Sequence, residues 1–198
     1  MLLLSNIATP TFHDTPLVRI VEQGYRLRLL SFGLGFVAAA AVLAAAGAPF
    51  VLLAMFGLCA GLWPGVARML ALRSGDPAAF EKRNLLIDSA IGGAWIALMQ
   101  FNVLPCALLT IVLSCDKTMS GGWILTLRGL TVQAAACVLT LALHGLVFAP
   151  ESSMLQIAAC LPLLIAYPLA LSLRLRQQGH SESAATIAAE FTSDTRIA

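Results

Sequence analysis

The sequence predicts an all-α membrane protein, and three observations lead to this prediction. Of the 198 residues, 59% are hydrophobic and only 11% are charged, which is more apolar surface than one soluble core of this size can bury. Several apolar runs have the roughly 17–25 residues that a helix needs to cross about 30 Å of hydrocarbon. Lysine and arginine gather in alternate connections between these runs. We therefore expect a polytopic bundle of six transmembrane helices.

The first two predicted spans form a helical hairpin. Residues 29–46 are rich in alanine and glycine, and Gly47 marks a tight turn before the second run, residues 50–70. Residues 1–28 precede the hairpin as an arm. Within this arm, residues 17–28 either lie along the membrane surface as an amphipathic helix or lead into the first span as a polar approach.

The third and fourth predicted spans follow a polar loop, residues 73–83. The third covers residues 85–101 and the fourth covers residues 103–115. The fourth is short, because about 13 strongly apolar residues reach only roughly 20 Å as a helix. It must therefore extend through Lys117 by snorkelling, thin the bilayer, or fail to cross.

The fifth and sixth predicted spans cover residues 123–148 and 154–173. The fifth is long enough to tilt, and Pro162 and Pro168 are expected to break or bend the sixth. Beyond the sixth span, the polar tail either continues the helix as a linker or frays as a terminus.

Basic residues predict the orientation of the bundle. They fall in the arm, in the loop of residues 73–83, between Lys117 and Arg128, and in the tail, whereas the other three turns hold none. By the positive-inside rule, both termini and these two loops are cytoplasmic. The predicted organisation is a cytoplasmic arm over residues 1–28, a membrane domain over residues 29–173 and a cytoplasmic tail over residues 174–198.

Two polar residues stand at the start of the third span. Asn84 and Asp88 lie four residues apart, so they share one face of a helix. A charged side chain inside the membrane has a high free-energy cost unless an opposite charge pairs with it. Arg128 is expected at a similar depth in the fifth span. We predict an Asp88–Arg128 ion pair that fixes the helix register, in preference to a ligand or proton site at Asp88.

Small residues and a turn follow on the same helix. Gly92 and Gly93 allow a neighbouring helix to approach closely in mid-membrane. Trp95 lies too deep for an interfacial belt, so we expect it to pack against the glycine face. Asn102 and Pro105 are expected to end this helix and begin a turn.

Further polar side chains are expected at the outer edge of the bundle. Gln133 and His144 lie eleven residues apart in the fifth span, about three helical turns, and therefore on a common face. With Gln100 and Asn102, His144 marks a place where a pocket open to the periplasm would form. The alternative is that His144 is a neutral packing residue that donates a hydrogen bond.

The sequence contains no signature of an enzyme. Five cysteines stand singly in apolar runs, without the spacing of a metal or redox site. There is no glycine-rich phosphate loop, nucleophile elbow or metal-ligand cluster, and no hydrophilic stretch long enough for a catalytic domain. We therefore expect no catalytic residue, no cofactor and no metal in this chain, and no nucleic acid as a partner.

The order and spacing of several residues resemble a known family. These residues are Asn84-Leu85 and Asp88, then Gly93, Trp95 and Met99, the run Asn102-Val103-Leu104-Pro105, Gly121-Gly122, Leu161-Pro162 and Tyr167-Pro168. From about Arg19 to Arg176, the chain resembles the second family of membrane-associated sensor domains. This resemblance implies a sensor domain of the bacterial inner membrane, which precedes the catalytic domain in diguanylate cyclases with a GGDEF domain and in some class III adenylate cyclases.

In that family the last helix leads through a short linker into the cyclase domain. The sequence ends in this linker, near Asp194. The resemblance therefore implies no cyclase activity for these 198 residues alone, unless they are part of a longer enzyme.

The sequence is compatible with three functions. The first is a sensor, which detects a periplasmic or bilayer signal and passes it through the sixth helix to a cyclase domain in cis or in trans. Such a sensor is expected to be a homodimer with its contact at Gly92 and Gly93. The second is a small transporter or channel, although we see no internal repeat between the two halves. The third is a structural dimerisation module.

Overall fold

The chain forms a bundle of α-helices. Its computed structural model describes the backbone of residues 16–145 and 147–194 and the side chains of residues 21–145 and 147–176. The predicted arm up to residue 15 and the tail side chains after residue 176 lie outside these ranges. Within the described ranges the helices are α1 (Pro16–Ala45), α2 (Phe50–Arg73), α3 (Pro77–Leu98), α4 (Val103–His144) and α5 (Met154–Asp194).

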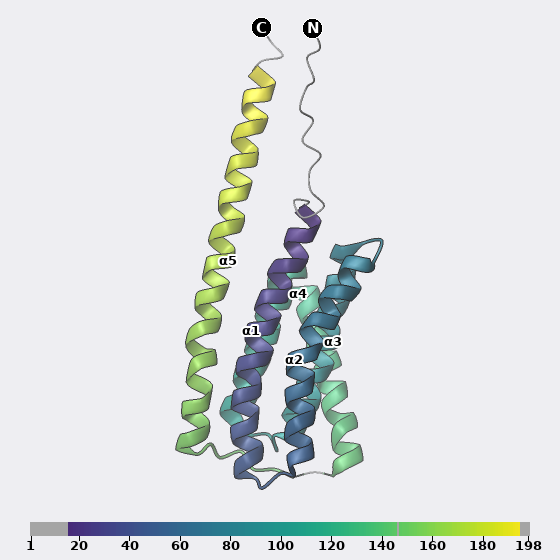
Figure 1. Cartoon of the computed structure of the whole chain (residues 1–198), viewed down its shortest axis with the longest axis vertical. Helices are drawn as coiled ribbons and strands as arrows, with labels where there is room; N and C mark the ends of the chain where they lie inside the picture. Colours follow the sequence, from purple (N-terminus) through teal and green to yellow (C-terminus); the bar gives the residue numbers. More distant parts are fainter. Residues whose placement is uncertain (1–15, 146, 195–198) are drawn as a thin grey trace, which may run out of the picture.

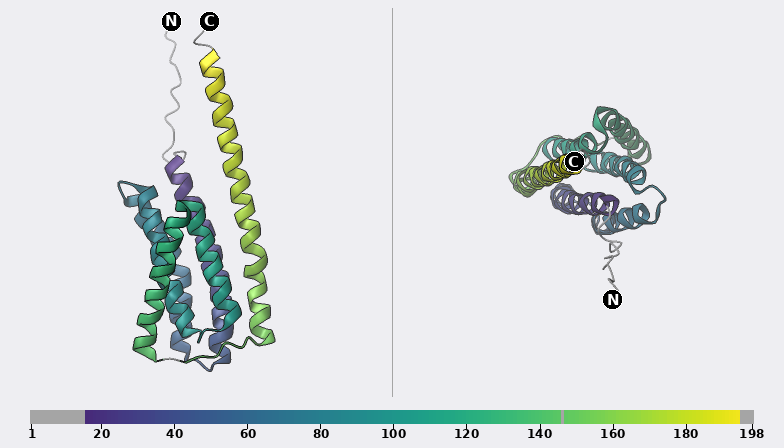
Figure 2. Two further views of the ribbon diagram at one scale, coloured as in Figure 1. Left: turned by 180° about the vertical axis from the view of Figure 1, so that it is seen from behind. Right: turned by 90° about the horizontal axis from the view of Figure 1, so that it is seen from above.

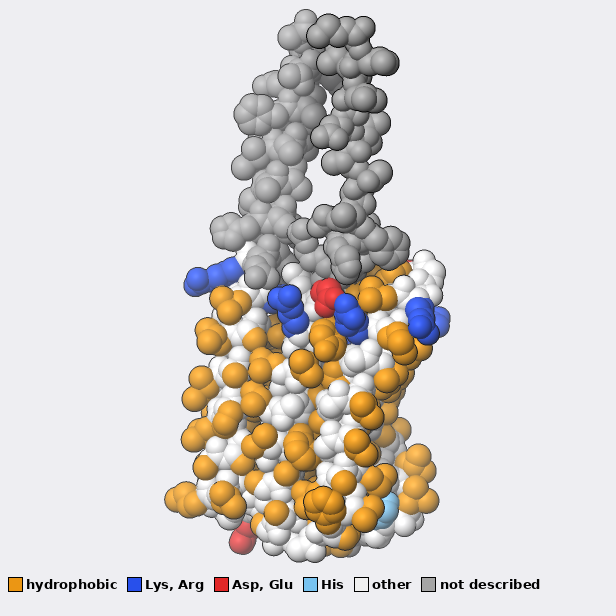
Figure 3. All heavy atoms as spheres, in the orientation of Figure 1, with side chains coloured by type: hydrophobic (Ala, Val, Ile, Leu, Met, Phe, Trp, Pro, Cys, Tyr) orange, Lys and Arg blue, Asp and Glu red, His pale blue; other side chains and the backbone are white. Residues whose placement is uncertain are grey.

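The helices run side by side and define two ends of the bundle (Figure 1). We call the upper end in Figure 1, where α1 begins and α5 leaves the bundle, the terminal end. The opposite end, which holds the connections α1–α2, α3–α4 and α4–α5, is the turn end. On the face seen in Figure 3, hydrophobic side chains cover the bundle, while lysine and arginine side chains gather near the terminal end. This distribution is the one expected for a helix bundle in a bilayer.

The helix assigned as α4 consists of two halves that meet at Gly122. Gly122 has a φ of 68° and a ψ of −165°, a conformation that glycine adopts without the steric cost of a Cβ. The chain reverses direction there, so that the two halves lie side by side and antiparallel (Figure 2). The predicted loop between Lys117 and Arg128 is therefore a tight turn flanked by helix on both sides.

Within the described part of the chain, four helices are long and apolar enough to cross a membrane, which makes the chain a multi-pass membrane protein. They are Val21–Ala45, Phe50–Arg73, Val103–His144 and Met154–Arg176. The predicted third span is not among them, because α3 carries Glu81, Lys82, Arg83 and Asp88. The predicted fourth and fifth spans fall together in α4. Length and composition thus give four candidate spans where the sequence predicted six.

Several helix boundaries differ from the predicted ones. α3 begins inside the expected polar loop, because the side chain of Asp76 caps it by accepting from the amide of Ala79 at 3.0 Å. Pro105 lies in the first turn of α4, where proline is tolerated. Pro162 and Pro168 lie inside α5 and do not end it, so their prediction as helix breaks is wrong.

Trp95 lies in the main hydrophobic core, between α1, α2 and α3. It stacks on Phe56 with ring centroids 4.7 Å apart and meets Phe32 edge-on at 5.6 Å. The predicted burial of Trp95 is confirmed, but its ring partners are these two aromatic residues. The reason is that Gly92 and Gly93 face α4, on the other side of α3.

The glycine pair permits a close approach of α3 and α4, as predicted. A Cβ at Gly93 would lie 2.1 Å from the backbone oxygen of Gln133, and one at Gly92 would lie 2.4 Å from Leu113. Both glycines are buried inside the bundle. Their predicted role as the contact between two copies of the chain is wrong, because a helix of the same chain occupies this face.

Candidate functional site

A charged network joins α1 and α3 inside the bundle. Arg28 of α1 is only 3% exposed, and its Nε donates to Asp88 Oδ2 at 2.9 Å. Its Nη2 donates to Glu81 Oε1 at 2.8 Å. Gly24 makes room for this arrangement, because a Cβ there would lie 2.4 Å from Glu81 Oε1. One guanidinium therefore binds two buried carboxylates.

Neutral donors from α2 and α3 complete the network. Trp63 of α2 donates from Nε1 to Asp88 Oδ1 at 2.6 Å. The amide of Asn84 donates to Glu81 Oε2 at 3.2 Å and to the backbone oxygen of Ala67 at 3.0 Å. All four carboxylate oxygens of Glu81 and Asp88 thus accept a hydrogen bond, which offsets the cost of burying these charges.

The predicted Asp88–Arg128 pair is wrong, because the partner of Asp88 is Arg28. The side chain of Arg128 is exposed, while its neighbour Gly129 faces the bundle and contacts Lys117. Successive positions on a helix differ by about 100°, so an inward Gly129 turns Arg128 outward. Arg28 precedes the first apolar run of the sequence and was therefore expected in the arm, whereas α1 begins at Pro16 and carries Arg28 into the bundle.

A second polar group, which the sequence argument did not identify, joins α4 to α5. The hydroxyl of Tyr167 donates to Asp116 Oδ1 at 2.9 Å and lies 3.0 Å from the backbone oxygen of Val112. Next to Asp116, Lys117 is buried and donates from Nζ to the oxygen of Leu113 at 2.6 Å. Lys117 therefore does not snorkel, and the first half of α4 continues past residue 115 with its lysine inside the bundle.

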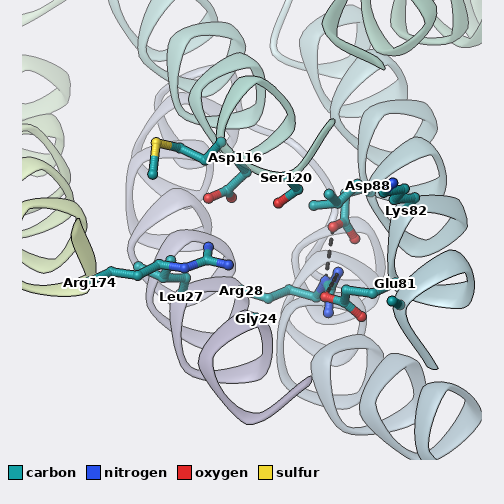
Figure 4. A pocket seen from close by; sticks show the side chains of 12 residues that line it. Gly24, Leu27, Arg28, Glu81, Lys82, Asp88, Asp116, Ser120 and Arg174 are labelled. Carbon is teal, nitrogen blue, oxygen red and sulfur yellow. Dashed lines mark hydrogen bonds and ion pairs between the residues drawn. The ribbon is translucent and has the colours of Figure 1, made fainter. Parts of the chain in front are cut away.

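A cavity of about 220 Å³ lies between α1, α3, α4 and α5 near the terminal end. Figure 4 shows Arg28 of α1, Asp88 of α3 and Asp116 of α4 around it, and Arg174 reaching in from α5. Arg28 Nη1 and Arg174 Nε are buried and have no hydrogen-bond partner among the described residues. The cavity thus connects the charged network to α5.

The residues assigned to the predicted outer pocket lie in different environments. Asn102 is buried and donates from Nδ2 to the backbone oxygen of Glu151 at 2.6 Å, while its Oδ1 accepts from Ser152 at 2.6 Å. Gln133 is buried and donates to Thr110 at 3.0 Å. His144 is exposed at the end of α4, so Gln133 and His144 do not share an environment. Asn102 instead fastens the α3–α4 turn to the segment before α5.

The described residues contain no group of three or more histidine, cysteine or acidic side chains placed to hold a metal ion. The five cysteines are free thiols. What the described site can do is hold charges inside the bundle and offer hydrogen-bond donors to a polar ligand in the cavity.

Comparison with known proteins relates part of the chain to signalling proteins. Residues 23–111 match the model of the MASE2 domain family. The probable diguanylate cyclase DgcC of Escherichia coli K12 is 33% identical over 108 residues, which is 54% of this chain and 29% of that protein. The DgcC protein of Escherichia coli O6:H1 gives the same values. The chain therefore spans less than a third of these relatives, and no solved structure matches it.

The matched residues include the whole Arg28 network and leave out the far wall of the cavity. Arg28, Trp63, Glu81, Asn84 and Asp88 all lie between residues 23 and 111. The contacts that attach α5 come from later in the chain, at Asp116, Tyr167 and Arg174.

Proposed function

We propose that the chain is a membrane sensor that passes a signal through α5 to a cytoplasmic cyclase domain, on the premise that residues 23–111 match the model of the MASE2 domain family. The signal reaches the bundle from the periplasm or the bilayer. The output is cyclic di-GMP, as the name of the diguanylate cyclase relative suggests. The cyclase domain acts in cis if these residues are part of a longer protein, and in trans otherwise.

The observation that carries this proposal is the course of α5. The helix spans the bundle and continues beyond it as one element from Met154 to Asp194 (Figure 1). Tyr167 and Arg174 join it to Asp116 and to the cavity. A change around the charged network would therefore reach a helix that leaves the membrane, which is the element expected to move an output domain.

We further propose that the chain crosses the bacterial inner membrane six times, with both termini in the cytoplasm. The reversal at Gly122 supports two passes in α4. α3 supplies a further pass through the membrane. Its carboxylates Glu81 and Asp88 are neutralised inside the bundle, and Lys82 and Arg83 are exposed near the terminal end. The lysine and arginine side chains near that end favour its placement in the cytoplasm (Figure 3).

Cysteine labelling tests this topology. Single cysteines replace Gly47 or Gly75 in a variant that lacks the five native cysteines. We expect a membrane-impermeant maleimide to label Gly47→Cys but not Gly75→Cys in intact spheroplasts. Equal labelling of both positions would place them on the same side of the membrane, so that α2 between them would not cross it once as proposed.

A chimera tests the relay. The present chain replaces the matched membrane region of the Escherichia coli cyclase, and cellular cyclic di-GMP is measured at equal protein level. We expect Tyr167→Phe, which loosens α5, to change cyclic di-GMP, and Ser172→Ala on the exposed side of α5 to leave it unchanged. A cyclase output that is indifferent to both variants, and to replacing the membrane domain by an unrelated one, would refute the relay.

A dimer is part of the proposal, because two diguanylate cyclase domains must face each other to react. The dimer contact lies elsewhere than the glycine pair, which is buried within one chain. Cross-linking of the native protein in its own membranes, read together with its intact mass, tests the dimer and distinguishes a cyclase in cis from one in trans.

A further inference from the structure

We propose that the cavity between α1, α3, α4 and α5 binds a phosphate group, held by Arg28 and Arg174 on opposite walls. This inference deepens the proposed sensor function by naming the class of its ligand. The claim that a phosphate binds depends on the cavity alone. The claim that binding changes the output depends on the proposed sensor function.

The cavity presents hydrogen-bond donors that the protein leaves unused. Arg28 is 3% exposed, and its Nη1 has no partner although its Nε and Nη2 are both engaged. Arg174 Nε is also buried without a partner among the described residues. Buried donors of this kind are rare in folded proteins, so both guanidinium groups face a place where an acceptor is missing.

Most carboxylate oxygens around the cavity already accept hydrogen bonds. Both oxygens of Glu81 and of Asp88 accept from within the network, and Asp116 Oδ1 accepts from Tyr167. The described lining adds Lys82, a donor, and the hydroxyl of Ser120, which can donate or accept. A ligand that brings its own acceptors would satisfy both guanidinium groups at once.

The ionisable side chains around the cavity carry no net formal charge. The three cations Arg28, Lys82 and Arg174 stand against the three carboxylates of Glu81, Asp88 and Asp116. Recognition therefore depends on where the groups lie: the two arginines offer donors, and Asp116, which accepts from Tyr167 through Oδ1, offers an acceptor. A phosphate ester with a hydroxyl group meets both demands, since its oxygens accept from the arginines and its hydroxyl donates to Asp116.

Phosphate suits this site by its shape. Guanidinium groups donate well to phosphate oxygens, and a tetrahedral phosphate presents oxygens to both arginines at once. Basic side chains between membrane helices also bind phospholipid head groups. At about 220 Å³, the cavity is smaller than the roughly 300–1,000 Å³ of sites for drug-sized ligands. It therefore suits a head group or a small phosphate ester, and not a nucleotide.

Binding would connect two parts of the bundle that no ion pair joins among the side chains of residues 21–145 and 147–176. Arg28 belongs to the network of α1 and α3, whereas Arg174 lies on α5 near the place where that helix leaves the bundle. A phosphate between them draws α5 toward α1. The ligand thus acts on the helix that carries the proposed output.

The experiment uses the full chain in nanodiscs of phosphatidylcholine. In one arm, phosphatidylglycerol is added to the bilayer and native mass spectrometry counts the bound lipid. In the other arm, glycerol 3-phosphate is added to the solution and titration calorimetry measures binding. We expect saturable binding of the lipid, which agrees with a signal from the bilayer. Saturable binding of glycerol 3-phosphate alone would keep the site but overturn the bilayer as the source of its ligand.

Two pairs of variants connect binding to the cavity. Arg174→Gln should weaken binding about tenfold or more, the usual effect of losing a hydrogen bond to a charged group. Arg176→Gln removes the same charge from an exposed position two residues further along α5 and should leave affinity unchanged. Lys82→Gln and Arg83→Gln form a second pair on α3, because Lys82 lines the cavity and Arg83 does not. None of these variants alters the buried Arg28–Asp88 ion pair.

Several outcomes would overturn the inference. Absence of saturable binding in both arms would mean that the cavity holds water only. Equal loss of affinity in Arg174→Gln and Arg176→Gln would mean attraction to the basic end of the bundle as a whole. If the ligand binds but the cyclic di-GMP level of the chimera does not change, the site exists and the relay is refuted. If Arg174→Gln abolishes binding and the chimera still responds to its signal, the ligand is not that signal.

Discussion

The first three helices and the last helix are held in the bundle by different means. α1, α2 and α3 share the buried network of Arg28, Glu81 and Asp88 together with the aromatic core around Trp95. α5 lies against α1 and α4 along a narrow stripe of Cys160, Leu163 and Tyr167. Its outer face is exposed and apolar, with Ile165 67% exposed and Leu169 59% exposed. We call α1, α2 and α3 together the frame, because these contacts hold them firmly. α5 is the helix that can shift at the lowest cost in free energy.

The strongest way to break the frame is to remove its cation. Arg28→Ala leaves Glu81 and Asp88 buried without a counter-charge. Removing one partner of a buried ion pair costs about 3–5 kcal/mol. We expect a loss of this size in the free energy of unfolding, measured by denaturant titration in detergent micelles.

Arg26→Ala is the matched control for this prediction. Arg26 lies on the same helix two residues earlier, and its side chain is exposed. Its replacement should change the unfolding free energy by no more than about 0.5 kcal/mol. Similar losses in both variants would show that the buried network does not hold the frame.

Close packing of α3 on α4 is the next feature to disturb. A Cβ at Gly93 would lie 2.1 Å from the backbone oxygen of Gln133, and a backbone atom cannot rotate away. Gly93→Ala should therefore destabilise the protein by about 1–3 kcal/mol, as overpacking does. Gly61→Ala on α2, where no atom lies within 4 Å of the added Cβ, should be tolerated in the same unfolding assay. Equal tolerance at both positions would contradict the close approach of the two helices.

A double-mutant cycle distinguishes the observed partner of Asp88 from the predicted one. We expect a coupling energy of about 1–3 kcal/mol between Asp88→Asn and Arg28→Gln, since contacting charges couple strongly. The cycle of Asp88→Asn with Arg128→Gln should give a coupling near zero, because Arg128 is exposed. Coupling to Arg128 that exceeds coupling to Arg28 would restore the pair expected from the sequence.

The fold and the site were accessible from the sequence to different degrees. Apolar runs and turn residues placed the helices, because the bilayer fixes their length and their composition. Gly93 was predictable as a close contact, since small residues mark helix interfaces in membranes. The sequence did not predict that Gly93 contacts α4 of the same chain, because the neighbours of a helix depend on turn geometry such as that at Gly122.

The site was harder to predict than the helices. Asp88 could be identified from the sequence as a buried charge. The cation that pairs with it could not, because that depends on where α1 begins. An arginine next to an apolar run can lie either inside the bundle or in the polar segment that flanks it. Asp116, Tyr167 and Arg174 come together only through the packing of α5 on α4. No local spacing in the sequence connects residues so far apart.

The smallest expected effect on stability concerns the attachment of α5, and it sharpens the contrast with the frame. Tyr167→Phe removes the hydroxyl that bonds to Asp116 and keeps the ring in the hydrophobic stripe. We expect a loss of about 0.5–1.5 kcal/mol, the net value of one hydrogen bond, and faster amide exchange along α5 with little change in α1 and α3. Ser172→Ala serves as the control, because its hydroxyl bonds only within α5, to the oxygen of Leu169. Exchange that rises equally in α3 and α5 would mean that the frame and the last helix unfold as one unit, and that α5 has no independence with which to carry a signal.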